Sequence, residues 1–125
     1  MSTAVLTGIH TVGVPVTDQD KALAFYTGSL GLSVRMDAPM GNGHRWIEVA
    51  APGAATSVAL IPAKDGMPAG VETGVRFITT SADEFHARLA AAGADVDAVL
   101  RWPGVPPMFA FRDQDGNGLE IVEQS

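Results

Sequence analysis

Apolar and polar residues alternate between positions 11 and 16, and this pattern predicts a β-strand. The apolar residues on one face of that strand are Val12, Val14 and Val16. From position 18 the apolar spacing becomes that of a helix face, with Leu23, Tyr26 and Leu30. Thr17 or Asp18 can cap the start of this helix, and Gly31 can end it. Residues 11–31 are therefore predicted to form a strand followed by a helix.

The same strand–helix unit returns in residues 74–94, which indicates an internal repeat. Val75 takes the place of Val12, and Phe77 takes the place of Val14, without a gap. Ser81 and Glu84 can form a capping box at the start of the second helix. The chain is therefore expected to contain two modules of one kind.

Three further segments with strand character follow each unit. The predicted strands are 8–16, 32–37, 44–50, 56–61, 73–80, 95–101, 107–112 and 117–123, and the predicted helices are 18–30 and 82–92. This order gives an α+β fold with two tandem βαβββ modules, in which the helices cover one side of a mixed sheet and leave a cup on the other. Residues 1–125 are expected to be one domain, with module one at about 8–62, a linker at 63–72 and module two at 73–123.

Composition narrows the class of protein. Hydrophobic residues make up 46% of the chain and charged residues 18%, which is typical of a globular protein. The net charge of −6, with no basic run, argues against binding to nucleic acid or to an anionic membrane. The absence of cysteine excludes disulfides, thiolate catalysis and sulfur-ligated metals. Because no signal peptide or membrane-spanning stretch is found, we expect a soluble cytoplasmic protein.

Several charged residues lie between apolar neighbours in the predicted strands. Such residues point away from the packed face, so Glu48, Arg76 and Glu120 are expected to face the cup. Trp46 and Met108 are expected on the same face. Two interpretations stay open at this stage. The charges form an internal ion network with no further role, or they are the polar groups of a small-molecule site.

Two other groups of residues are expected to be structural. The acids of residues 113–117, DQDGN, lack the spacing and terminal glutamate of a calcium loop, so a tight turn between two strands is predicted. Trp102, Phe109 and Phe111 are expected to be core residues or dimer contacts.

Three segments resemble the vicinal oxygen chelate superfamily, which includes glyoxalase I, bleomycin-resistance proteins and extradiol dioxygenases. They are VPVTDQDKALAFYTGSLGL at 14–32, SADEFHARLAAAG at 81–93 and FRDQDGNGLEIVE at 111–123. The most specific is the last, because D-x-D-G-N before an apolar strand is typical of these proteins. The resemblance implies paired βαβββ modules, a cup-shaped sheet around a ligand, and a homodimer.

Metal-using members of that superfamily place four ligands on the cup. Comparison without gaps puts the corresponding positions at Thr11, Ala59, Gly74 and Glu120, of which only Glu120 carries a suitable donor. His10 lies one residue before Thr11, and such a shift turns a strand side chain to the other face unless a bulge intervenes. We therefore predict no metal or other cofactor, and expect His10 at a strand edge or against a helix.

The predicted function is the binding of a small organic molecule in the cup. The expected ligand-binding residues are Thr11, Trp46, Glu48, Arg76, Met108 and Glu120. The acids in this set favour a basic or amphipathic ligand. An alternative is a metal-independent lyase or isomerase, in which Glu120 acts as base and Arg76 stabilises an oxyanion. A metal-dependent glyoxalase or dioxygenase is disfavoured by the missing ligands.

Overall fold

The computed structural model describes residues 3–124 and arranges their strands in two sheets. The elements of the first half are β1 Thr11–Val16, α1 Gln19–Ala24, the π-helical turn η1 Phe25–Ser29, β2 Ser33–Pro39, β3 Arg45–Ala50 and β4 Ser57–Pro62. Those of the second half are β5 Glu72–Thr79, α2 Ala82–Ala91, β6 Asp95–Val96, β7 Leu100–Trp102, β8 Val105–Arg112 and β9 Gly118–Glu123.

Each half of the chain forms its own sheet, and the strands of the two sheets follow corresponding orders. The first sheet has the order β1-β4-β3-β2, and the second has the order β5-β9-β8-β6, with β7 also paired to β8. In each sheet the first strand pairs in parallel with the last strand of its module, and the other neighbours are antiparallel. The predicted α+β fold with two repeated modules is confirmed.

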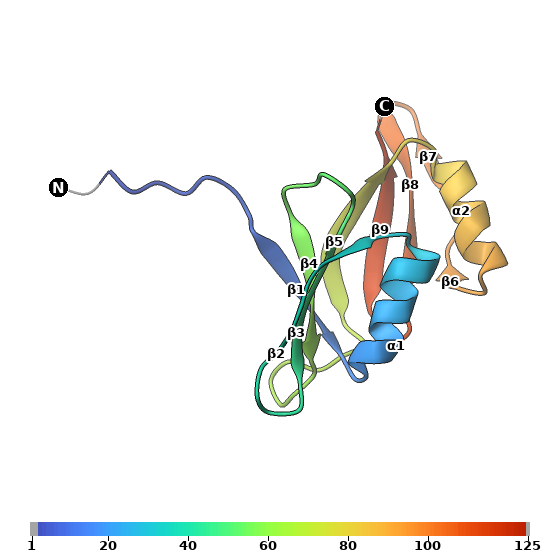
Figure 1. The fold of residues 1–125 in the computed structure, drawn as a ribbon. Coiled ribbons are helices and arrows are strands. Elements are labelled where there is room, and N and C mark those ends of the chain that lie inside the picture. The colour runs from blue at the N-terminus through green and yellow to red at the C-terminus, as the bar shows by residue number, and fades with distance from the viewer. Residues whose placement is uncertain (1–2, 125) are drawn as a thin grey trace.

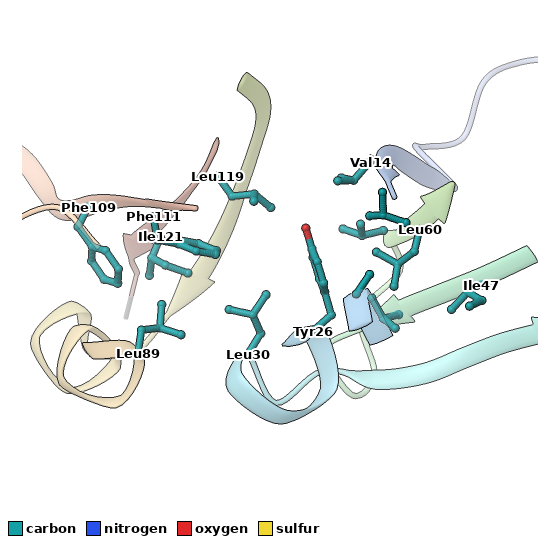
Figure 2. Close-up of a cluster of buried hydrophobic side chains, with 14 of the residues drawn as sticks. Val14, Tyr26, Leu30, Ile47, Leu60, Leu89, Phe109, Phe111, Leu119 and Ile121 are labelled. Atoms are coloured by element: carbon teal, nitrogen blue, oxygen red, sulfur yellow. The ribbon is translucent and has the colours of Figure 1, made fainter. Parts of the chain in front are cut away.

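The first helical segment, α1 and η1, lies on the same side of the strands as α2 (Figure 1). Tyr26 and Leu30 lie between side chains of the first sheet, such as Val14 and Leu60, and side chains of the second, such as Ile121 (Figure 2). All five belong to one core cluster. The two modules therefore share a hydrophobic core, and we call the face of each sheet that points away from that core its open face.

Two predicted elements differ in the structure. The helix expected over 18–30 becomes a π-helical turn after Ala24, where Leu30 N donates to Phe25 O at 3.1 Å. This wider turn leaves both Tyr26 and Leu30 buried. The strand expected over 95–101 is divided into β6 and β7. Trp102, at the end of β7, is 53% exposed, so it is not a core residue of this chain, and its alternative role as a dimer contact stays a prediction.

The turn at residues 113–117, between β8 and β9, holds the two modules together through hydrogen bonds. Asn117 is fully buried, and its Nδ2 donates to Pro15 O of β1 at 2.9 Å. Its Oδ1 accepts bonds from the backbone N–H groups of Gly70 and Val71, just before β5. The expected tight turn is present, since Gly116 N donates to Asp113 O at 3.0 Å. Besides turning the chain, this segment fixes the second module against the first.

Residues 3–10 form an arm that extends away from both sheets (Figure 1). Three apolar side chains on it are largely exposed: Val5, Leu6 and Ile9. The arm is attached at its end, where Ser57 N donates to His10 O at 3.1 Å. No helix in the described part of the chain is long and apolar enough to cross a membrane.

Candidate functional site

Glu48 lies at the centre of a polar cluster on the first sheet. Its neighbours Ile47 and Val49 are core residues, so Glu48 belongs to the opposite face, yet it is only 3% exposed. Trp46 Nε1 donates to Glu48 Oε2 at 2.7 Å, and Ser57 Oγ donates to Glu48 Oε1 at 2.7 Å. These two hydrogen bonds hold the pKa of the Glu48 carboxyl below its ordinary value. Glu48 is therefore a buried, ionised and satisfied carboxylate.

Two residues at the start of β1 join this cluster. Thr11 Oγ1 and Ser57 Oγ lie 2.7 Å apart, and His10 Nε2 lies 3.5 Å from Glu48 Oε2. The structure places His10 directly before β1, an edge strand of the first sheet, which agrees with the expected position at a strand edge. His10 precedes β1, so strand alternation does not set its direction. It is 75% exposed and covers Glu48 from the side of the arm.

The second sheet carries a different charged pair. Arg76 and Glu120 are opposite each other in the register of β5 and β9, and Arg76 Nη2 lies 3.4 Å from Glu120 Oε1. The side chains are 64% and 34% exposed, respectively, so this ion pair is open to water. Met108, half-buried on β8, is opposite Val122 in the next row of the sheet.

The predicted site residues thus form two groups. Thr11, Trp46 and Glu48 are linked through Ser57 in the first module, whereas Arg76 contacts Glu120 in the second. Within the described residues, no hydrogen bond or ion pair connects one group to the other. The ligand-binding roles of these residues, and the catalytic roles of Glu120 and Arg76, stay predictions.

A cavity of about 490 Å³ lies where the two modules meet, and we call it the seam cavity. Its wall comes from β1, the end of the first helical segment, the β3–β4 connection, β5, α2 and β9. Representative lining residues are Val12, Leu30, Ala54, Phe77, Phe85 and Ile121. Of the six predicted ligand-binding residues, only Arg76 lines it.

Strand alternation could not have found most of this wall. All residues from Thr73 to Thr79 line the cavity, which therefore follows the edge of β5 and not one of its faces. Among the described strands, β5 pairs only with β9, so this edge has no strand partner there. Residues 50–56 contribute through a loop whose position no periodicity defines.

The donors present do not fit a transition-metal site. At the four positions that the sequence resemblance implies for a metal, Thr11, Ala59 and Gly74 offer no imidazole or carboxylate beside Glu120. His10 and Glu48 approach each other elsewhere, but both oxygens of Glu48 already accept hydrogen bonds. In the part of the chain that the structure describes, no three His, Asp or Glu side chains gather as a metal site would require.

Comparison with known proteins identifies the family. The sequence model of the Glyoxalase/Bleomycin resistance protein/Dioxygenase superfamily matches residues 8–121, so the chain belongs to that superfamily. The resemblance seen in the sequence is thereby confirmed. Among curated proteins, the uncharacterized protein YetH of Bacillus subtilis is 31% identical over 117 residues, which cover 92% of this chain and 97% of YetH.

Solved structures of similar proteins also match this chain. TnmS3, an antibiotic binding protein from Streptomyces sp. CB03234, is 33% identical, with a TM-score of 0.87 over 98% of this chain and 99% of TnmS3. A glyoxalase/bleomycin resistance protein from the same organism is 35% identical, with a TM-score of 0.81 over 92% of this chain and 99% of that protein. The chain is thus similar over nearly its full length to a protein that binds an antibiotic.

Proposed function

We propose that this protein binds a small organic molecule in the seam cavity and that it does so without a metal. The cavity itself carries the proposal. Its volume of about 490 Å³ falls within the range of small-molecule pockets, roughly 300–1,000 Å³. Its wall is mostly apolar with one charged side chain, Arg76, and this composition favours an amphipathic ligand over a strongly polar one.

The similarity to TnmS3 supports the same class of function. An antibiotic binding protein needs a pocket but no reacting groups, and Glu48, the most buried acid of the predicted site, is fully engaged in hydrogen bonds. The argument for a basic ligand rested on Glu48 and Glu120. Neither of these acids lines the seam cavity, so that argument does not extend to it.

We also propose that the protein acts as a homodimer. The arm exposes Val5, Leu6 and Ile9 to solvent, and β7 of the second sheet exposes Leu100 and Trp102. Exposed apolar residues that gather on an arm and a strand are typical of protein–protein contacts. Light scattering of the purified protein tests this: a mass of one chain at micromolar concentration would contradict it.

The binding proposal is tested by a bulky substitution at an exposed residue of the cavity wall, which should fill the cavity. Ala54 lines the cavity in an exposed loop, whereas its exposed neighbour Ala55 is not part of the wall. A panel of cationic, neutral and anionic aromatic compounds is first screened for ligand-induced thermal stabilisation. The Ala54→Trp variant should lose the stabilisation by every hit, and Ala55→Trp should keep it. Equal stabilisation of both variants would place the ligand elsewhere.

A further inference from the structure

The charge distribution around the seam cavity indicates which ligands it takes. Among the described residues of its wall, Arg76 is the only one with an ionisable side chain. The acids nearest to it in the sheet register, Glu72 and Glu120, do not line the cavity. The described wall therefore contains one basic residue and no acidic residue.

Three threonine hydroxyls of the wall are already occupied. Thr73 Oγ1 donates to Gly118 O at 2.7 Å, and Thr56 Oγ1 donates to Ile9 O at 3.0 Å. Thr79 Oγ1 lies 3.4 Å from Ser81 O. The hydroxyl hydrogens of these threonines are thus committed to backbone oxygens. The guanidinium of Arg76 is the strongest donor that the wall can offer to a ligand.

Arg76 is also free to turn toward a ligand. Its recorded partner is Glu120, through one long contact of 3.4 Å, and a guanidinium has several further N–H donors in a planar fork. Glu120 is 34% exposed, so water can hydrate its carboxylate when Arg76 leaves it. A planar fork of donors matches the two oxygens of a carboxylate or sulfonate.

We propose that the preferred ligands of the seam cavity are amphipathic organic anions, with an apolar or aromatic body in the cavity and an acidic group on Arg76. This inference rests on the proposed function and specifies the ligand class for the same cavity. The apolar body is expected to contact residues such as Phe77, Phe85 and Leu30. The anionic group is expected at the mouth, where Arg76 is exposed to solvent.

Three naphthalene compounds of nearly equal size test the ligand class by isothermal titration calorimetry: 2-naphthoate, 2-naphthylmethanol and 2-naphthylmethylammonium. With the wild-type protein, 2-naphthoate should bind roughly tenfold or more tightly than the neutral alcohol, the scale of a hydrogen bond to a charged group. The ammonium compound should bind more weakly than the alcohol. In Arg76→Met the advantage of 2-naphthoate should disappear, while affinity for the alcohol is retained.

A matched control is Arg101→Met. Arg101 is an exposed arginine paired with Asp83, and it is not part of the cavity wall. This variant should keep the preference for 2-naphthoate. If the alcohol binds but charge has no effect, or if the ammonium compound binds best, the ligand class is wrong and the proposed function stands. If none of the three compounds binds, and the wider panel gives no stabilisation that Ala54→Trp removes, the proposed function itself fails.

Discussion

The hydroxyl of Tyr26 donates a 2.7 Å hydrogen bond to Oδ2 of Asp113, and this bond crosses from the first module to the second. Tyr26 is fully buried, and Asp113 is 7% exposed. Asp113 also accepts bonds from Asn117 N and Nδ2, and Asn117 in turn donates to Pro15 O. The seam cavity lies between the same two modules, so its shape depends on this buried polar contact.

Replacing Tyr26 by phenylalanine should therefore destabilise the protein. The change removes one donor from a buried carboxylate while keeping the ring in the core, and we expect a loss of about 1.5–3 kcal/mol in the free energy of unfolding. Urea denaturation measures it. The control is Thr27→Ala, which removes only a local bond to Leu23 O in the same helical segment. A loss for Tyr26→Phe no larger than that of the control would contradict the role of the contact.

The same residue predicts an alkaline limit to stability. Burial, and then the charge of Asp113, raise the pKa of Tyr26 above its ordinary value of 10.0. The folded state therefore keeps the phenolic proton at a pH where the unfolded state loses it, so stability is complete below about pH 10 and declines above it. In urea denaturation at several pH values, the free energy of unfolding of the Tyr26→Phe variant should decline less steeply between about pH 10 and 12 than that of the wild type. If the free energy of unfolding falls with pH equally steeply in the wild type and the variant, this prediction is wrong.

The hydrogen bonds to Glu48 predict that the stability of the protein depends on pH in the acidic range. Hydrogen bonds from Trp46 and Ser57 lower the pKa of Glu48 from its ordinary value of 4.5, so their stabilising effect is present above about pH 4.5 and is lost as the pH falls through the lower, folded-state value. Trp46→Phe should cost about 1–3 kcal/mol at pH 7. Thermal unfolding should show that the difference from wild type narrows below pH 4.5. A difference that is constant with pH would mean that lost packing alone explains it.

The absence of a metal is a prediction with a direct readout. Glu120 alone cannot hold Zn²⁺, Fe²⁺ or Ni²⁺, since such ions need several nitrogen, oxygen or sulfur donors. Elemental analysis of protein purified without chelator should give far less than one metal per chain, and EDTA should leave the melting temperature unchanged. Near-stoichiometric metal that is lost in Glu120→Gln or His10→Ala would show that the donor comparison was wrong.

The repeated pattern of valines and helix residues was enough to predict the fold, because burial on one face of a strand or helix leaves a period in the sequence. Strand alternation also placed Glu48 on the face opposite to Ile47 and Val49, and it placed Arg76 and Glu120 on the same face. It could not show that Trp46 and Ser57 enclose Glu48, since such contacts depend on the distance between strands. His10 precedes β1, so alternation does not set the direction of its side chain, and its contact with Glu48 had no signal in the sequence.

The turn at 113–117 shows a second limit of sequence reasoning. Its residues predicted a tight turn correctly, because Asp, Asn and Gly have local preferences that the sequence displays. Their long-range partners, Tyr26 and Pro15, are far away in the chain and have no local signal. The seam cavity was missed for the same reason. It forms only when the edge of β5 and the β3–β4 loop come together.

The central claim is that a small organic molecule binds in the seam cavity, and amide chemical shifts test it most directly. Addition of 2-naphthoate to isotope-labelled protein should shift the amide signals of Ala50, Ala54 and residues 73–79, which lie on two sides of the cavity. The signals of the Glu48 cluster on the opposite face, such as Ser57 and Thr11, should change less. Saturable shifts confined to that cluster, with residues 73–79 unaffected, would contradict the account.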